Sequence, residues 1–531
     1  MKKIFSDRTK YTLIFVLAIL FRLVHFFQVY QTPLISPDYV PDTLPFILIA
    51  QKILEGNFFY TIPMNMNVLY SLYLVPFVFF FSESILPAVA VQLIIDAFSA
   101  VITYLIARKI FDERAGLSAG IIYAVYAPLI LFAGMPVGES ISIFFLLLSF
   151  YLLIKALDLK EHSLYYYLSG LAAGIASTGR PNVIVSSVLT IAVLFFYNQQ
   201  DKKYYSSTLR YILGIVIVLL PFSLNNYYLE KSFSPYPAKG GLNFYIGNHP
   251  EAKGIYELIP GTSNLPYIYM HESQEVASQE AGRELSAQEA DMYWYQKGMN
   301  FITGHPVDAI SLLFKKTLLF MNNKELATNL DHDFCKEFSF ILKYAVIPPG
   351  LLIAFAIMGI IMIPNNKNIV LLKLFLVGLV ISTVIFFISD RYRIVSLPFV
   401  IILSSGYIFV LYDYLRQKEK TKMALAASAT IVLIIITFLP VNIFKINTAR
   451  TTSFAYYQYG IYLLNRNKIE EAVPQFQKAI QLNSLDPEPY YYLSYIYDKK
   501  KQYRTAGEYK NKADMLGFKE DKAKTLRGTG N

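Results

Sequence analysis

The sequence has little cysteine and little charge. Its 531 residues include one cysteine, Cys335, so the chain can form neither an internal disulfide bridge nor a cysteine-based zinc site. Charged residues make up 16% of the chain, against about 25% in an average soluble domain. Together with 55% hydrophobic residues, this excludes a disordered, fibrous or ordinary cytosolic protein. The composition predicts a chain that crosses a membrane many times.

Histidine is also scarce. The six histidines are scattered along the chain, and none is followed four residues later by another. Pairs with that spacing on one helix face are typical of zinc sites, so no metal ligands are predicted. We expect that no cofactor is required, while a divalent cation stays open.

Positive charge exceeds negative charge. The chain has 48 Lys and Arg against 38 Asp and Glu, a net charge of +10. Ten of these cations and only four carboxylates fall in residues 499–531. A charge run is most often a solvated segment, so we predict a basic tail at 518–531. Attraction of this tail to anionic lipid head groups is the alternative.

Apolar runs follow one another from Tyr11 to about Phe444, which defines a predicted membrane domain over 1–444. About eleven of them are long enough, or nearly so, to cross about 30 Å of hydrocarbon as helices. No small-residue cleavage site follows the cationic N-terminus, so the first run predicts a retained anchor. The predicted spans are 11–28, 84–108, 115–135, 139–156, 164–179, 182–197, 209–228, 340–363, 369–388, 394–413 and 422–444.

The apolar run 67–81 decides the topology. If it lies on the outer surface, every short cationic loop shares the side of the cationic N-terminus, as the positive-inside rule expects. If it crosses, all these loops move outside. We therefore predict a multi-pass protein of the cell membrane with a cytoplasmic N-terminus. The first loop, 28–83, the large loop, 229–339, and the C-terminal segment then lie on the outer face.

Residues 451–517 contain two copies of a 34-residue helix–turn–helix pattern, which is typical of tetratricopeptide repeats. Two repeats are fewer than the three or so that independent stability requires. We expect them to pack against the outer loop, other helices or a partner. They suggest a protein partner or acceptor; a scaffold that only caps the outer loop is the alternative. The pattern residues are Tyr456, Gly460, Leu463, Ala472, Phe476 and Ala479, then Tyr490, Leu493, Tyr497, Ala506 and Ala513.

The first outer loop carries two aspartates, Asp38 and Asp42. Asp42 occupies the N-cap position of a predicted helix, with Pro45 in its first turn, so it could simply cap that helix. It could also serve as a general base at the mouth of a membrane cavity. The two interpretations are compatible, because a capped carboxylate is fixed in place and stays ionised.

Other charges are predicted at helix ends on the same face. Glu139 opens an apolar span, where it would gain from the helix dipole. Arg180 lies in a short break between two spans and suits either lipid head groups or a phosphate. Arg391 and Arg393 run against the positive-inside trend, and phosphate binding would explain both. For Arg22, within the first span, we predict that the side chain snorkels to the membrane surface or pairs with a loop carboxylate.

The large outer loop contains Asn248, His249 and His305 among glycines and aromatic residues. Such side chains can bind sugars through hydrogen bonds. More often they form turns, and the sequence leaves both interpretations open.

Taken together, residues 10–410 resemble the polytopic glycosyltransferases with the GT-C fold that use polyprenyl-phosphate sugars. These include the protein O-mannosyltransferases and the lipid A aminoarabinose transferase. Four motifs carry the resemblance: Asp42 with Phe46, Glu139, Arg180 after a Gly/Ala-rich span, and Arg391-Tyr392-Arg393. The chain departs from the family at Asn65-Met66-Asn67, where members close to the aminoarabinose enzyme carry a Glu-Lys pair. The C-terminal repeats are not general to the family.

The resemblance implies an all-helical membrane enzyme with outer juxtamembrane helices at 43–56 and 67–81. It implies an inverting transfer of a sugar from the lipid phosphate to a hydroxyl of an envelope glycan, glycolipid or protein. Asp42 would be the general base, and Glu139 would orient the acceptor or position a cation. Arg180, Arg391 and Arg393 would hold the phosphate, and Asp38 would shape the loop. The alternatives are another polytopic type of oligosaccharide transferase, such as an O-antigen ligase, and a non-enzymatic lipid-glycan transporter or assembly platform.

Overall fold

The computed structural model describes most of the chain. All secondary-structure elements in the described residues are helices, apart from one isolated bridge between Ile255 and Ile388. The all-helical fold class predicted from the sequence is confirmed for this part of the chain. The described residues are 7–37, 39–40, 42–57, 67–82, 84–159, 164–198, 203–260, 262, 266–328, 331–344 and 347–518.

Each of the eleven predicted spans is helical, but their number is not confirmed. Seven helices in the described residues are long and apolar enough to cross a membrane, or up to eight if one bent pair is a single span. The seven are α1 (Asp7–Val29), α4 (Leu86–Ile110), α7 (Glu139–Asp158), α10 (Lys203–Glu230), α18 (Lys367–Val384), α20 (Leu397–Arg416) and α21 (Lys420–Thr437). The bent pair is α5 (Glu113–Val125) and α6 (Ala127–Gly134).

The remaining three predicted spans are shorter helices. α8 (Leu164–Gly179) and α9 (Val183–Asn198) have 16 residues each. The run 340–363 is broken at Pro348 and Pro349 into α16 (Phe340–Tyr344) and α17 (Pro349–Met362). A proline has no backbone N–H to donate within a helix, so a helix restarts here rather than continues.

The bend of 52° between α5 and α6 has a local cause. Pro128 has no N–H, so the carbonyl of Ala124 loses its partner within the helix. The Arg22 guanidinium of α1 donates to that carbonyl at 2.8 Å. Arg22 also forms an ion pair with Asp96 of α4, and both side chains are fully buried. Arg22 therefore neither snorkels nor pairs with a loop carboxylate, in contrast to the expectation from the sequence.

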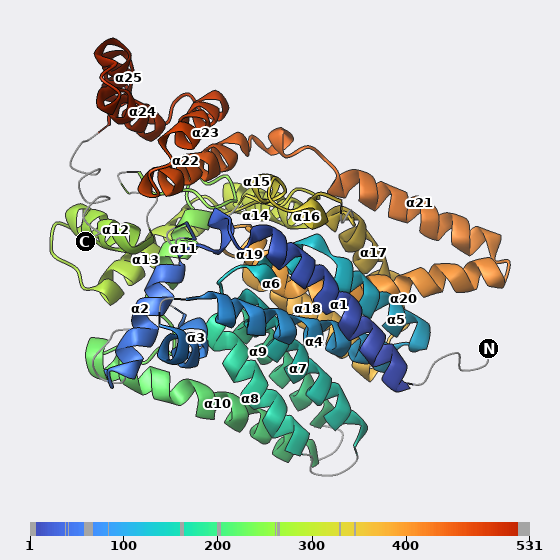
Figure 1. Cartoon of the computed structure of the whole chain (residues 1–531). Coiled ribbons are helices and arrows are strands. Elements are labelled where there is room, and N and C mark those ends of the chain that lie inside the picture. The colour runs from blue at the N-terminus through green and yellow to red at the C-terminus, as the bar shows by residue number, and fades with distance from the viewer. Residues whose placement is uncertain are drawn as a thin grey trace.

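Two groups of helices cover one end of this bundle. The first outer loop forms η1 (Pro33–Ile35), α2 (Thr43–Leu54) and α3 (Val68–Phe81), close to the predicted juxtamembrane helices. The large loop forms α11 (Gly240–Gly247), α12 (Pro266–Ala281), α13 (Ala287–Gly304), α14 (Pro306–Met321) and α15 (His332–Cys335). Both groups lie near the short α19 (Asp390–Arg393) and η2 (Ile394–Ser396), which precede α20 (Figure 1).

The C-terminal segment forms two helical hairpins, which Figure 1 shows above α14 and α15. Gly460 packs directly on the Phe476 ring, where a Cβ atom would lie 2.6 Å from a ring carbon. The predicted tetratricopeptide identity stays a prediction, and residues 519–531 of the predicted tail lie outside the described residues. After η3 (Val441–Phe444), the helices are α22 (Ala449–Asn465), α23 (Ile469–Leu482), α24 (Pro487–Lys499) and α25 (Tyr503–Met515).

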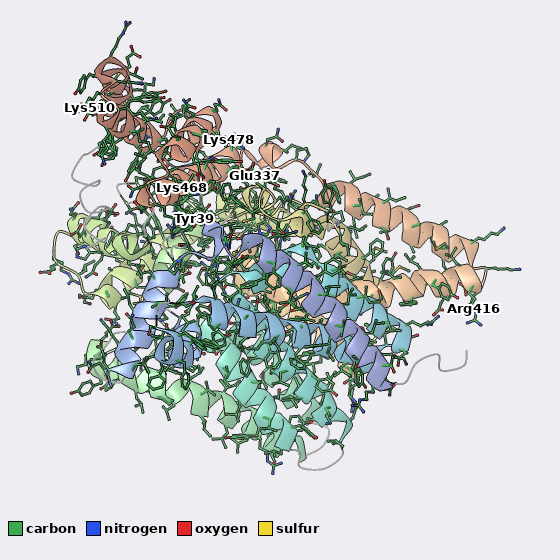
Figure 2. The ribbon with its side chains drawn as sticks, viewed as in Figure 1. Tyr39, Glu337, Arg416, Lys468, Lys478 and Lys510 are labelled. Carbon is green, nitrogen blue, oxygen red and sulfur yellow. The ribbon has the colours of Figure 1, made fainter. Side chains whose placement is uncertain are left out.

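The first hairpin is packed against the rest of the protein, as expected for so short a repeat segment. The Phe334 ring of α15 lies 5.0 Å from the Tyr456 ring of α22. The Tyr39 hydroxyl donates to the Ala455 carbonyl at 3.2 Å. Lys478 forms a 3.0 Å ion pair with Glu337, and Figure 2 labels Tyr39, Glu337 and Lys478 close to the first hairpin.

Candidate active site

Asp42 lies at the N-cap position of α2, as predicted, but its side chain makes no capping hydrogen bond to the helix. The carboxylate instead forms an ion pair with the Arg391 guanidinium. Only 7% of Asp42 is exposed. The helix start thus fixes the backbone of Asp42, while the carboxylate remains directed to a charged partner from the distant α19.

Glu139 is the first residue of α7, and Arg391 contacts it as well. The Arg391 Nε donates to Glu139 Oε1 at 2.6 Å, and Arg180 forms a second ion pair with the same carboxylate oxygen. One arginine therefore links the two acidic residues that the sequence predicted as catalytic. A planar guanidinium suits this task, because its donors point in fixed directions.

The backbone before Glu139 is held by two polar side chains. Gln92 of α4 donates to the carbonyls of Met135 at 2.7 Å and Ala133 at 3.0 Å. Thr43, next to Asp42, donates to the Pro136 carbonyl at 3.1 Å. These bonds satisfy carbonyls at and just after the end of α6 that lack helical partners, and they tie the start of α7 to the start of α2.

Arg180 directly follows α8 and completes the cluster. Besides its ion pair with Glu139, its guanidinium lies 5.9 Å from the centre of the Tyr392 ring. Asp42, Glu139, Arg180 and Arg391 are thus brought together from four elements. They form the cluster that we call the carboxylate–arginine site.

Arg393 lies on the other side of α19 from this site. Its guanidinium forms an ion pair with Glu325 at 2.6 Å and donates to the Asn322 carbonyl, also at 2.6 Å. Arg393 is therefore bound to the loop that follows α14, and its phosphate-binding role stays a prediction.

The predicted loop residues have other contacts. The Asn248 amide donates to the carbonyls of Phe244 and Ile385, both at 2.8 Å, and its oxygen accepts from the buried Lys316 at 3.0 Å. His249 lies beside the Tyr245 ring. His305 is exposed at the junction of α13 and α14, and Asp38 lies outside the described residues.

The charges around Asp42 determine its protonation. Burial alone would raise the pKa of Asp42, but the charge and hydrogen bond of Arg391, with the charges of Lys239 and Arg180, outweigh it. The pKa of this carboxyl is therefore held below its usual range, and Asp42 is ionised at neutral pH. Lys239 was not foreseen, because a single lysine before two glycines carries no recognisable pattern.

The site can attract and hold an anion. Three cations, Arg180, Lys239 and Arg391, act on two carboxylates. Guanidinium groups held in a largely buried site favour an anionic ligand such as a phosphate. Among the described residues, no group of three or more His, Cys, Asp or Glu could hold a metal ion.

The comparisons with known proteins begin with a family match. Residues 69–228 match the family model described as dolichyl-phosphate-mannose-protein mannosyltransferase. The matched segment runs from α3 to α10 and includes Glu139 and Arg180. No curated protein matches the sequence significantly.

Solved structures of membrane glycosyltransferases are similar at low identity. The oligosaccharyltransferase AglB from Archaeoglobus fulgidus, bound to an inhibitory peptide and a dolichol-phosphate, is 14% identical, with a TM-score of 0.47. That match covers 83% of this chain and 56% of AglB, so the chain spans little more than half the archaeal protein. The oligosaccharyltransferase of the same archaeon in complex with zinc and sulfate is also 14% identical, with a TM-score of 0.44 and coverages of 80% and 53%.

ArnT from Cupriavidus metallidurans in the apo state is 13% identical, with a TM-score of 0.33; the match covers 76% of this chain and 78% of ArnT. The family match over residues 69–228, together with seven helices in the described residues that are long and apolar enough to cross a membrane, agrees with the membrane glycosyltransferase predicted from the sequence.

Proposed function

We propose that the protein transfers a sugar from a polyprenyl-phosphate donor to an acceptor hydroxyl at the outer face of the cell membrane. One observation carries the proposal. Arg391 joins the carboxylates of Asp42 and Glu139, and Arg180 lies beside them. A base and a set of phosphate-binding cations are the two components that this reaction needs.

The reaction follows from these charges. The ionised Asp42 takes the proton from the acceptor hydroxyl, and the hydroxyl oxygen attacks the anomeric carbon of the sugar. The bond from that carbon to the phosphate oxygen breaks, and the polyprenyl phosphate leaves with the electron pair. Because attack and departure take place on opposite faces, the configuration at the anomeric carbon inverts. Arg180, Arg391 and Lys239 stabilise the charge on the departing phosphate.

The donor would also activate the base. In the free protein, Arg391 holds Asp42 ionised and so makes it a weak base. A phosphate competes for the same guanidinium with two oxygens in matching geometry. Once Arg391 turns to the phosphate, Asp42 loses much of its counter-charge while it remains buried. Its pKa then rises, so that the carboxylate becomes basic enough to accept a proton only when the donor is in place.

The other predicted residues take supporting roles in this proposal. Glu139 positions Arg180 and Arg391, and it lies where it can accept a hydrogen bond from the acceptor. We assign the charge of Arg393 to anchoring α19 on Glu325. Asp38, Asn248, His249 and His305 remain candidates for acceptor binding.

The substrates are proposed by class. AglB has been solved with a dolichol-phosphate and a peptide, and the matched family carries the name of a dolichyl-phosphate-mannose enzyme. We propose a polyprenyl-phosphate sugar as donor and a glycan, glycolipid or protein as acceptor. The N-terminus would face the cytoplasm. The C-terminal repeats would lie outside, where they can bind a protein partner.

The test compares envelope glycolipids and exported glycoproteins by mass spectrometry. A deletion strain would be complemented with wild type, with Asp42→Asn or with Asp308→Asn, a matched control on the exposed side of α14. We expect one sugar to disappear in the deletion strain and to return with wild type and the control only. Equal restoration by Asp42→Asn would refute the base assignment and favour a transporter or assembly platform.

A further inference from the structure

The segment between α14 and the end of α15 lies between the carboxylate–arginine site and the C-terminal hairpins. Its described residues, 322–328 and 331–335, have no part in the chemistry proposed above. They contact α19 on one side and α22 on the other. We call these residues the clamp segment.

The clamp segment holds α19 at both ends. At the first residue, His332 Nε2 lies 3.0 Å from Asp390 Oδ2, and the Asp390 N–H donates to the Leu326 carbonyl at 2.9 Å. At the last residue, Arg393 is bound to Glu325 and to the Asn322 carbonyl, each at 2.6 Å. Arg391 lies between these two anchors, and its side chain crosses to Asp42 and Glu139.

The opposite side of the clamp segment is bound to the first hairpin. The Thr452 hydroxyl of α22 donates to Asp331 Oδ2 at 2.9 Å, while Asp331 Oδ1 accepts from the Phe334 N–H, also at 2.9 Å. Asp331 therefore joins α22 to the start of α15. Its neighbour in the chain, His332, reaches α19.

We infer that His332 is a positioning residue that holds Arg391 in register with Asp42 and Glu139 through Asp390, and that α22 braces it through the bond from Thr452 to Asp331. The C-terminal helices are then part of the working site as well as a surface for partners. The inference deepens the proposed function and rests on it for its catalytic consequence. A displacement of about 0.5 Å is enough to impair a site of this kind, which is why both anchors matter.

The charges around His332 favour its protonated form. Burial lowers the pKa of His332, but the hydrogen bond to Asp390 and the charges of Glu325, Asp390 and Asp331 outweigh it, so the pKa lies above its ordinary value. The facing groups are Asp390 and the paired Arg393 from α19, Glu325 and Asp331 from the clamp segment, and the Phe132 ring of α6 at 6.2 Å. The ion pair is present below this pKa and is lost as the pH rises through it.

The experiment uses the full-length protein in lipid nanodiscs, with a readout that needs no substrate. Hydrogen exchange of the amides of residues 390–396 would be followed by mass spectrometry in wild type, His332→Ala, His332→Gln and Thr452→Val. His271→Ala and Thr451→Val serve as matched controls, since His271 is exposed on α12 and the Thr451 hydroxyl donates to the carbonyl of Thr448, the residue before α22. We expect about tenfold faster exchange in His332→Ala and Thr452→Val, and near-normal exchange in His332→Gln, whose amide can still donate to Asp390.

Transfer activity gives the second readout. We expect kcat to fall at least tenfold in His332→Ala, with partial rescue in His332→Gln. In wild type, loss of the His332 proton should lower kcat at alkaline pH, and this alkaline limb of the pH profile should be absent in both variants. Unchanged exchange in His332→Ala would overturn the inference whatever the activity shows. Faster exchange in His332→Ala but not in Thr452→Val would overturn the brace from α22. If the exchange rates change as expected but the wild-type protein transfers no sugar, the clamp is supported and the proposed function is refuted.

Discussion

Asp42 and Arg391 are separated by 349 positions in the sequence, yet they form one partly buried ion pair. The pair costs desolvation energy that it recovers only with good geometry and further hydrogen bonds. Glu139 provides the second partner, and Arg391 contacts both acids through different guanidinium nitrogens. This shared arginine supports the proposal that a phosphate can replace a carboxylate as its partner.

The shape of Arg391, and not only its charge, should matter. In Arg391→Lys a single ammonium replaces the planar fork and cannot hold two carboxylates or two phosphate oxygens in fixed directions. We expect kcat/KM to fall by about 100- to 1000-fold, the usual loss when one stabilising donor is removed. Arg391→Gln should also lower stability by about 3–5 kcal/mol, because the buried Asp42 loses its ion-pair partner and Glu139 keeps only Arg180.

The matched control is Arg416→Lys at the exposed end of α20, which Figure 2 labels far from the hairpins. Its transfer rate and thermal midpoint should equal those of wild type. Near-normal activity of Arg391→Lys would show that charge alone suffices and would contradict a phosphate held by paired hydrogen bonds.

The pH dependence should differ between the free protein and its donor complex. Because Arg391 depresses the pKa of Asp42, the base stays ionised until the pH falls through that lowered value. The acid limb of kcat/KM, which reports the free protein, should therefore lie below the usual carboxyl range. The acid limb of kcat should lie at higher pH, since bound phosphate diverts Arg391. In Arg391→Gln burial dominates, so the limb of kcat/KM should also move upward.

The contribution of the ion pair to folding stability should also fall as the pH is lowered. A carboxyl with a depressed pKa contributes stability above its unfolded pKa and loses it as the pH falls through the folded value. Thermal unfolding of wild type and of Asp42→Asn against pH, without substrate, would measure this contribution as the difference between the two proteins. Coincident acid limbs of kcat and kcat/KM would contradict activation of the base by the donor.

Much of this arrangement could be predicted from the sequence. Hydropathy located the helices, and the positive-inside argument placed Asp42, Glu139, Arg180 and Arg391 on one face, where the structure brings them together. Hydropathy could not give helix lengths, because proline breaks such as Pro348-Pro349 fall inside apolar runs. It also could not divide the roles of Arg391 and Arg393, which are two residues apart on a short helix and so point in different directions.

Residues whose importance comes only from tertiary contacts were missed. His332 and Lys239 have no motif around them, and Gln92 is an uncharged polar residue in a mostly apolar helix. Asp96 offered a signal that could have been used, since a carboxylate in the middle of a predicted span needs a partner. Arg22, in the first span, was available to pair with it.

The first hairpin depends on a glycine at a fixed place. A methyl group at Gly460 would lie 2.6 Å from the Phe476 ring, so Gly460→Ala should push α22 and α23 apart. Overpacking of this kind costs about 1–3 kcal/mol. Gly507→Ala in α25 is the matched control, since nothing lies within 4 Å of its added Cβ. Alanine favours a helix, so the control should gain about 0.5–1 kcal/mol. Limited proteolysis of the two variants should show earlier cleavage after residue 444 in Gly460→Ala alone.

The buried Arg22 should couple to a proline 106 positions later, since it satisfies the carbonyl that Pro128 leaves without a partner. Arg22→Met removes the ion-pair partner of Asp96 and the hydrogen-bond donor to the Ala124 carbonyl, and breaking a buried ion pair costs about 3–5 kcal/mol. Pro128→Ala restores an N–H that can reach Ala124. It should therefore raise the thermal midpoint more in the Arg22→Met background than in wild type, where the carbonyl is already bonded.

A double-mutant cycle on the thermal midpoint in detergent measures this coupling directly. The expected interaction energy is about 1–3 kcal/mol, the cost of an unsatisfied buried carbonyl. Asp96→Asn with and without Pro128→Ala is the control cycle, because it weakens the ion pair and leaves the bond from Arg22 to Ala124 in place. An equal effect of Pro128→Ala in the wild-type and Arg22→Met backgrounds would mean that the bend between α5 and α6 is set by other contacts. Arg22 would then serve only as the counter-ion of Asp96.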